Sequence, residues 1–272
     1  MTRRVEYEQM RPPEIARERA RCPLVFIPIG PLEWHGPHLP VGTDGLHAHA
    51  VAVGVAQRVG GVVLPTYFMG TETVRLNDQA AQSLTILGFS GTERIVGMDF
   101  PGNSVRSLYF EESAFALAIR ELVRLLKADG YRLVVLLNGH GAVNHQRALR
   151  RLAAEESQPP GVRVEYAMAF APAAPPHTDP GHAEKVETSL MLAMLPDLVD
   201  LDALPPRDVR LRYQDYGIVE GKAFDGHPTP DFTLRDEADP RDASAAMGAE
   251  ILGVEVARLE RLINERLKEM KL

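Results

Sequence analysis

The sequence contains a single cysteine, Cys22, among its 272 residues. One cysteine excludes an internal disulfide and a thiolate cluster, so a bound metal would need oxygen and nitrogen ligands. No apolar run approaches the roughly 20 residues that a transmembrane helix requires, and the charged N-terminal segment lacks the apolar centre of a secretory signal. We therefore expect a soluble cytoplasmic protein in which Cys22 is a small buried residue.

Basic patches with interleaved aromatic side chains are also missing. The net charge is −7, aromatic residues make up 6% of the chain, and Trp34 is the only tryptophan. This composition argues against a nucleic-acid or membrane partner and favours a small-molecule substrate. The length, with 25% charged and 45% hydrophobic residues, predicts one globular domain over residues 1–272.

Apolar runs alternate with amphipathic segments along most of the chain. Strands are predicted at 24–29, 61–68, 132–138 and 162–170, and helices at 13–21, 44–59, 111–129, 144–156, 182–195 and 242–270. This alternation predicts an α/β fold, a three-layer sandwich whose central, mostly parallel sheet carries helices on both faces. In such sheets, ligands collect outside the carboxyl ends of the strands.

Two segments interrupt the alternation. Residues 70–110 lack a sustained period and hold several glycines, which predicts a long excursion near the site with one short strand or hairpin. A Pro-rich loop is expected at 172–180, and the irregular residues 196–238 are interpreted as a lid or a subunit contact.

Carboxylates and imidazoles crowd residues 28–49, directly after the first predicted strand. The segment contains Glu33, His35, His38, Asp44, His47 and His49. Glu33 and His35 are two apart, so both side chains leave the same face if the strand extends that far. Asp44 lies at the expected start of a helix, where its two oxygens could bridge two cations, and the cluster predicts a dinuclear metal site. For His47 and His49 alone, roles unconnected with metal are favoured.

Two further motifs follow later in the chain. Asn138-Gly139-His140-Gly141 ends the strand at 132–138, so His140 should lie at the same sheet edge as Glu33 and His35, with the glycines allowing a tight turn. The segment GHAEKVETS at 181–189 is predicted to begin a helix with His182 near its start and Glu187 a turn later. An exposed helix carboxylate is the alternative interpretation of Glu187.

In this order, ExHGxHLPxxTD at 33–44, NGHG at 138–141 and HAxxxETS at 182–189 resemble the creatininase family of metal-dependent amidohydrolases, over about residues 24–260. The resemblance implies two divalent ions per chain, either Zn, Mn or Fe, which can generate hydroxide and polarise a carbonyl. It implies that Glu33, Asp44 and His140 hold one ion, that His35, Asp44 and Glu187 hold the other, and that His182 is the catalytic residue that handles protons. It also implies a homo-oligomer, commonly a hexamer.

The chain departs from the family pattern at three points; the first two leave the predicted ligands in place, and the third bears on the substrate. Creatininase itself has a glutamate where Ala142 stands, so its role should pass to Glu187. An asparagine that many relatives carry two places after the position of Gly141 comes one place later here, at Asn144. The tryptophans with which creatininase closes over its substrate are missing, since Trp34 is the only one, and creatinine is therefore not favoured.

The segment IVGMDFPGNSVRSLYFEE at 95–112 resembles the branch of this family that hydrolyses 3-dehydro-scyllo-inosose, a diketo-inositol. This resemblance implies cleavage of a carbon–carbon bond after hydroxide adds to one carbonyl. The candidate substrate-binding residues, for which ordinary surface roles are the alternative, are His38, Arg75, Asn77, Asn103, Arg106 and Tyr109. Two other functions stay open: an amidohydrolase that cleaves the C–N bond of a cyclic amide or formamide, and a metal-stabilised binding protein without turnover.

Overall fold

The computed structural model describes residues 3–75, 95–99, 103–170, 181–209, 211, 213–214, 217–218 and 236–272. Its central sheet has the strand order β2-β1-β5-β6, with all neighbouring strands parallel. These strands are β1 (Leu24–Ile29), β2 (Val62–Val63), β5 (Leu133–Asn138) and β6 (Arg163–Met168). Every residue of β1 and β5 is buried, as expected for parallel strands that are covered on both faces.

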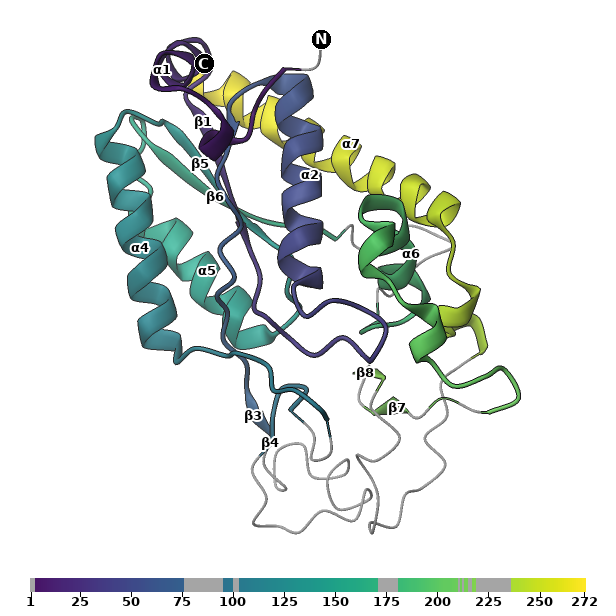
Figure 1. Cartoon of the computed structure of the whole chain (residues 1–272). Coiled ribbons are helices and arrows are strands. Elements are labelled where there is room, and N and C mark those ends of the chain that lie inside the picture. The colour runs from purple at the N-terminus through teal and green to yellow at the C-terminus, as the bar shows by residue number, and fades with distance from the viewer. Residues whose placement is uncertain are drawn as a thin grey trace.

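Helices cover both faces of this sheet (Figure 1). They are α1 (Pro12–Arg21), α2 (Thr43–Val59), α4 (Glu112–Ala128), α5 (Val143–Glu156), α6 (Lys185–Met194) and α7 (Ala245–Met270). The long helix α7 packs on both α2 and α6. Among the described residues, no helix combines the length and apolar character that crossing a membrane would require.

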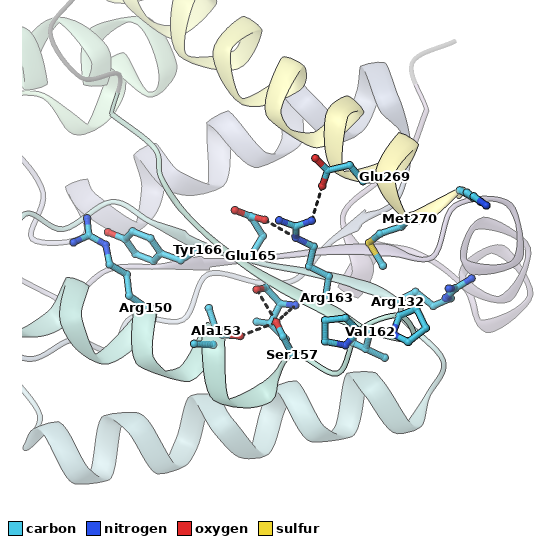
Figure 2. A pocket seen from close by; sticks show the side chains of 15 residues that line it. Arg132, Arg150, Ala153, Ser157, Val162, Arg163, Glu165, Tyr166, Glu269 and Met270 are labelled. Atoms are coloured by element: carbon cyan, nitrogen blue, oxygen red, sulfur yellow. Dashed lines mark hydrogen bonds and ion pairs between the residues drawn. The ribbon is translucent and has the colours of Figure 1, made fainter.

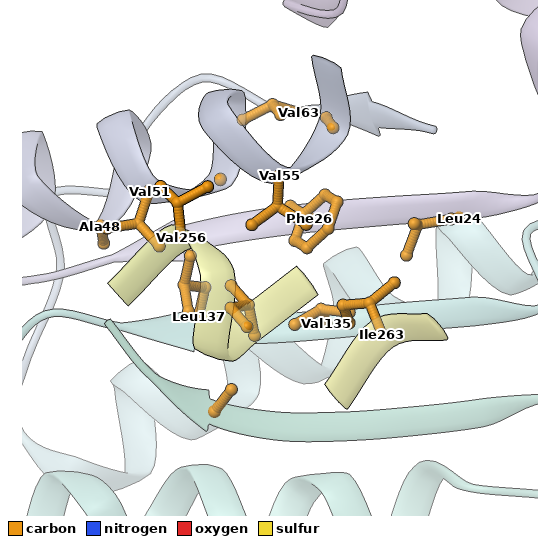
Figure 3. Packing of buried hydrophobic residues seen from close by; sticks show 14 of the residues in the cluster. Leu24, Phe26, Ala48, Val51, Val55, Val63, Val135, Leu137, Val256 and Ile263 are labelled. Atoms are coloured by element: carbon orange, nitrogen blue, oxygen red, sulfur yellow. The ribbon is translucent and has the colours of Figure 1, made fainter. Parts of the chain in front are cut away.

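Alternation along β1 separates two hydrophobic cores. Leu24 and Phe26 point to the core shared with α2 and α7, where they meet Val55 and Val256 (Figure 3). Ile27 and the other alternate residues of β1 point to the opposite core, which α4 and α5 cover. The three-layer α/β arrangement predicted from the sequence is therefore confirmed.

The structure corrects the boundaries of three predicted elements. The strand expected at 61–68 pairs regularly only at Val62 and Val63. The chain continues beside β1, with Tyr67 N donating to Pro28 O at 2.9 Å, but Pro65 has no N–H to extend a regular ladder. The helices expected from His182 and from Asp242 begin only at Lys185 and at Ala245.

In the excursion at 70–110, β3 (Val74–Arg75) and β4 (Ile95–Val96) pair antiparallel, in agreement with the short strand or hairpin predicted there. Residues 76–94 and 100–102 of this excursion, and the Pro-rich loop at 172–180, lie outside the described residues. In the segment 196–238, short 3-10 turns occur at Pro196–Leu198 and Leu201–Ala203, and β7 (Tyr213–Gln214) pairs with β8 (Gly217–Ile218). Most of its remainder also lies outside the description.

Strand β6 forms one edge of the sheet, and its amino end is capped by side chains. Ser157 Oγ accepts from Val164 N at 2.9 Å, and Arg163 forms ion pairs with Glu165 and Glu269 at 2.9 and 2.6 Å. Beside these residues, between α5 and the end of α7, lies a cavity of about 830 Å³ (Figure 2). None of the residues lining this cavity is a predicted site residue.

Candidate metal centre

The carboxyl ends of β1 and β5 lie side by side and place two polar loops at one edge of the sheet. Ile29 pairs with Asn138 in the register, and Gly139 N donates to Ile29 O at 2.9 Å. Asn138 then fixes the second loop, because its Oδ1 accepts from His140 N and its Nδ2 donates to His140 O, both at 2.8 Å. His140 is thereby held beside the loop that follows β1.

Helix α2 begins at Thr43 and brings Asp44 against the end of β5. The approach is so close that a Cβ on Gly139 would overlap the Asp44 carbonyl oxygen. The sequence predicted that Gly139 and Gly141 serve a tight turn, but neither has a positive φ. Gly139 is instead required because only a residue without a side chain leaves room for the helix start.

The Asp44 carboxylate lies between two imidazoles. Its Oδ1 is 3.1 Å from His35 Nε2, and its Oδ2 is 2.9 Å from His140 Nδ1. Each imidazole has a second carboxylate nearby: Glu187 Oε2 is 3.8 Å from His35 Nε2, and Glu33 Oε2 is 3.3 Å from His140 Nδ1. Two groups that could hold an ion therefore share Asp44, and in each group the candidate ligand atoms lie within 4.8 Å of one another.

These two groups contain the same residues that the family resemblance implied, namely Glu33, His35, Asp44, His140 and Glu187. Strand β1 ends at Ile29, so Glu33 and His35 lie in the following loop and not on an extended strand. A third group joins Glu33 and His35 to His182, which the sequence had placed outside the ligand sets.

Backbone carbonyls orient two of the imidazoles. The Glu33 carbonyl accepts from His35 Nδ1 at 3.0 Å, and the Trp34 carbonyl accepts from His182 Nε2 at 2.6 Å. Because a carbonyl oxygen only accepts, these nitrogens carry protons, and His35 Nε2 and His182 Nδ1 are the atoms that face the carboxylates. Such a hydrogen bond on the far nitrogen is typical of metal-ligating histidines.

The segment before α6 explains why the helix does not start at His182. Ala183 adopts a left-handed backbone conformation with φ 58°, and its N–H donates to Glu187 Oε2 at 2.5 Å. This turn directs His182 toward Trp34, and the following helix places Glu187 in the site. Glu187 is only 4% exposed, so the alternative of an exposed helix carboxylate is wrong.

The three carboxylates are buried, and their pKa values differ. Burial would raise the pKa of Asp44, but His35 and His140 outweigh it and hold that pKa below its ordinary value. The pKa of Glu33 is likewise lowered, because His140 outweighs the effect of burial. Burial raises the pKa of Glu187 to about 7, so this carboxyl retains its proton more readily than the other two.

The pKa values of the imidazoles also differ in direction, being raised for two of them and lowered for the third. Burial lowers the pKa of His35, but Asp44 and Glu187 outweigh it and raise this pKa to about 10. Carboxylates also raise the pKa of His140 well above its ordinary value, against the effect of burial. Burial and the neighbouring His35 lower the pKa of His182 to about 4, so His182 is neutral at neutral pH.

The donor set fits a divalent cation. Within the described part of the chain, no lysine or arginine lies within 4.0 Å of the carboxylates of Glu33, Asp44 or Glu187. In the metal-free protein the imidazoles of His35 and His140 supply positive charge beside these carboxylates, and a bound cation would take the place of their protons. Carboxylate and imidazole donors without thiolate suit zinc, manganese and iron.

Two of the candidate substrate-binding residues have defined partners near the centre. Tyr109 donates its hydroxyl proton to Glu33 Oε1 at 2.5 Å, which places it against a candidate metal ligand. Asn103 donates to the Met98 carbonyl at 3.0 Å, within the same excursion.

Of the other four candidates, the described residues place the side chains of His38 and Arg106. His38 is 2% exposed and its Nε2 is 2.9 Å from Thr188 Oγ1, so it connects the loop after β1 to α6. Arg106 is exposed to solvent. The side chain of Arg75 lies outside the described residues, as does Asn77.

Sequence reasoning did not identify two neighbours of His140. His145 is fully buried with its ring 5.1 Å from that of His140, and burial holds the pKa of His145 well below its ordinary value. Glu72 Oε2 lies 3.8 Å from His140 Nε2. His145 follows the NGHG motif by four residues, one turn into the next helix, and this spacing was the available signal.

His47 and His49 do not join the centre. His47 Nε2 is 2.6 Å from Glu255 Oε2 on α7, and both side chains are buried. His49 pairs with Glu6 at 3.1 Å. The interpretation that these two histidines have roles unconnected with metal agrees with these contacts.

Comparison with known proteins now decides the family. The family profile described as "Creatininase: Creatinine amidohydrolase" matches residues 8–263. The chain belongs to the creatininase family. A creatinine amidohydrolase from Pseudomonas putida is 30% identical over 223 residues, which cover 71% of this chain and 76% of that protein.

Two further relatives carry the names of other hydrolases. A mycofactocin precursor peptide peptidase from Mycolicibacterium smegmatis is 30% identical over 67% of this chain and 62% of that protein. A 3-dehydro-scyllo-inosose hydrolase from Thermotoga maritima is 24% identical over 72% of this chain and 58% of that protein. All three named relatives are hydrolases, and this chain is a creatininase-family hydrolase.

Solved creatininase structures share the fold over almost the whole chain. A tryptophan-to-phenylalanine mutant of creatininase superposes with a TM-score of 0.67 at 27% identity and covers 97% of this chain and 99% of that chain. Two others, named as a Mn form and as a Zn-Zn type mutant, both have TM-scores of 0.65 at 26% identity and cover 97% of this chain and 98–99% of theirs. Together with the candidate groups of this chain, these structures support divalent-metal binding.

Proposed function

We propose that this creatininase-family hydrolase uses two divalent cations to add water to a small polar cyclic carbonyl compound and open its ring. The observation that carries the proposal is the position of Asp44 between His35 Nε2 at 3.1 Å and His140 Nδ1 at 2.9 Å. Glu33 and Glu187 complete the two groups, so one carboxylate would serve both cations.

The chemistry divides between the cations and the chain. Bound divalent cations would polarise a carbonyl oxygen and lower the pKa of water. His182 would move the protons: its Nε2 proton is committed to the Trp34 carbonyl at 2.6 Å, and its Nδ1 faces Glu33 Oε2 at 3.8 Å. Because His182 is neutral near neutral pH, Nδ1 can accept a proton from the attacking water and return it to the departing group.

We rank a diketo-inositol such as 3-dehydro-scyllo-inosose as the first substrate. The oxygen of water would add to one carbonyl, the adjacent carbon–carbon bond would break, and the second carbonyl would stabilise the electron pair before its protonation. Trp34 is only 3% exposed and offers no open ring face for stacking on a flat creatinine ring. A polyol would be recognised by hydrogen bonds, which discriminate strongly when the wrong ligand leaves polar groups of the site unpaired.

A second candidate reaction is hydrolysis of a C–N bond in a cyclic amide or formamide. The observation in its favour is that the two relatives at 30% identity are named as a creatinine amidohydrolase and a peptide peptidase. Both reactions would use the same metal groups and differ in the bond that breaks.

The experiment uses purified protein prepared without chelator. Elemental analysis should find close to two first-row divalent metals per chain. Protein that contains no such metal would overturn the metal assignment. The metal-loaded protein is then incubated with a diketo-inositol, creatinine, and a panel of lactams and formamides, and mass spectrometry follows the addition of one water.

Each outcome separates the candidates. Hydrolysis of the diketo-inositol supports the first ranking, whereas creatinine or a lactam opening alone would support the C–N reaction. Metal binding without water added to any compound would favour a metal-stabilised binding protein.

A further inference from the structure

The end of the 70–110 excursion is attached to the loop that carries Glu33. Leu108 N donates to Leu32 O at 2.7 Å, and Trp34 N donates to Ser107 Oγ at 2.9 Å. These two hydrogen bonds hold residues 107–109 alongside residues 32–34. On the other side of Tyr109, Phe110 N donates to Gly70 O at 2.7 Å, so the backbone is fixed both before and after the residue that reaches Glu33.

The neighbours of the Tyr109 hydroxyl determine the direction in which its proton points. Met98 N donates to the hydroxyl oxygen at 3.2 Å, and the hydroxyl oxygen is 2.5 Å from Glu33 Oε1. Because a phenol has one proton, that proton must point to the Glu33 carboxylate.

The two oxygens of Glu33 therefore have different neighbours. Oε1 accepts from Tyr109, while Oε2 lies 3.3 Å from His140 Nδ1 and 3.8 Å from His182 Nδ1. The ring of Tyr109 also lies against that of His140, with centroids 6.4 Å apart and planes inclined by 29°. One side chain thus contacts two members of the same candidate metal group.

We propose that Tyr109 is a positioning residue, which holds Glu33 Oε1 so that Oε2 is presented to a cation shared with Asp44 and His140. This inference rests on the proposed function and assigns Tyr109 a role in the metal centre, beyond the substrate contact that the sequence predicted. Outer partners of this kind typically contribute about 10–100-fold to metal affinity.

Gly97 offers an independent way to test the same contact. It has φ 52°, and a Cβ at this position would lie 2.5 Å from the Tyr109 hydroxyl oxygen, 2.7 Å from its Cζ and 2.3 Å from Glu72 Cγ. All three distances are shorter than van der Waals contact, so an alanine would displace the hydroxyl, together with the side chain of Glu72, without altering Tyr109 itself.

The experiment measures the affinity of the folded protein for Zn²⁺ by competition with a chromogenic chelator. Tyr109→Phe removes only the hydroxyl, and we expect Zn²⁺ binding to weaken about 10–100-fold. Gly97→Ala should weaken binding in the same direction. The matched control is Tyr131→Phe, because Tyr131 is fully buried at the start of β5 and its hydroxyl has no hydrogen-bond partner, and we expect its affinity to be unchanged.

A second measurement separates positioning from general destabilisation. The visible spectrum of the Co²⁺-loaded protein reports ligand geometry, and it should change in Tyr109→Phe and stay unchanged in Tyr131→Phe, with thermal melting recorded for each variant. Unchanged affinity and spectrum in folded Tyr109→Phe would overturn this inference alone. Wild-type protein that binds neither Zn²⁺ nor Co²⁺ would overturn the proposed function, and this inference with it. If Tyr109→Phe does not fold, unchanged binding by Gly97→Ala overturns the inference.

Discussion

The crossing of α6 and α7 gives a sharp prediction, because it depends on the absence of one side chain. A Cβ on Gly248 of α7 would overlap the carbonyl group of Ser189 on α6 and would lie 2.8 Å from Leu190 N. These atoms belong to backbone, so no side chain can rotate away, and the two helices must move apart in Gly248→Ala. Forced overpacking of this kind costs about 3 kcal/mol at the upper end of its usual range.

The gain in helix propensity offsets only part of this cost. Replacing glycine by alanine within a helix stabilises it by about 1 kcal/mol, which leaves a net loss of about 2 kcal/mol for Gly248→Ala. A chain of 272 residues unfolds with an entropy of about 0.6 kcal/mol/K. The melting temperature should therefore fall by about 3–4 °C.

The same helix contains its own control. A Cβ on Gly253 of α7 would meet no atom within 4 Å, so Gly253→Ala should gain helix propensity without a clash. We expect its melting temperature to rise by about 1–2 °C, opposite in sign to that of Gly248→Ala. Differential scanning calorimetry of the metal-free proteins measures both. A Gly248→Ala protein that melts at or above the wild-type temperature would refute the close crossing.

Three further predictions concern the metal centre. Asp44→Ala should lose both cations and turnover together, because Asp44 is the carboxylate that contacts both His35 and His140, whereas Asp129→Ala, an exposed carboxylate, should keep both; elemental analysis and the hydrolysis assay decide this. His182→Ala should lower turnover by about 10²–10⁴-fold while metal content survives, and loss of metal would make His182 a ligand. In the metal-free protein the pKa values of Glu187 and His35 are raised to about 7 and about 10, above their ordinary values of 4.5 and 6.5. The two protonated groups contribute their full stability at a pH below their ordinary pKa values, and this contribution is lost as the pH rises through about 7 for Glu187 and about 10 for His35. Because bound cations would replace these protons, added Mn²⁺ should raise the melting temperature more at about pH 8 than at about pH 6.

The sequence predicts the centre of the sheet well, for a physical reason. β1 and β5 are buried on both faces, so their apolar runs end sharply where the polar loops begin, and the predicted and observed limits differ by at most one residue. β2 was predicted too long because its apolar pattern continues past Val63, whereas regular pairing requires an N–H that Pro65 lacks.

The candidate metal groups could be predicted because their residues follow strand ends or begin helices that the topology brings to one edge. The hydrogen bonds and turns that hold these residues in place could not be predicted from the sequence. The hydrogen bond between Tyr109 and Glu33 joins residues 76 positions apart through a segment without periodicity. The left-handed turn at Ala183, which orients His182, could not be predicted either, because alanine rarely adopts this backbone conformation.

The contact of α7 with α2 and α6 sets an order of assembly during synthesis. His47, one turn after Asp44 on α2, pairs with Glu255 on α7, which is made 208 residues later. The loop that carries Glu33 and the helix α2 that carries Asp44 therefore leave the ribosome long before α7, which packs against α2, has been made. In the growing chain the first candidate ligands are synthesised early, whereas the helix that supports them is synthesised last. The complete centre is therefore assembled only once α7 has emerged.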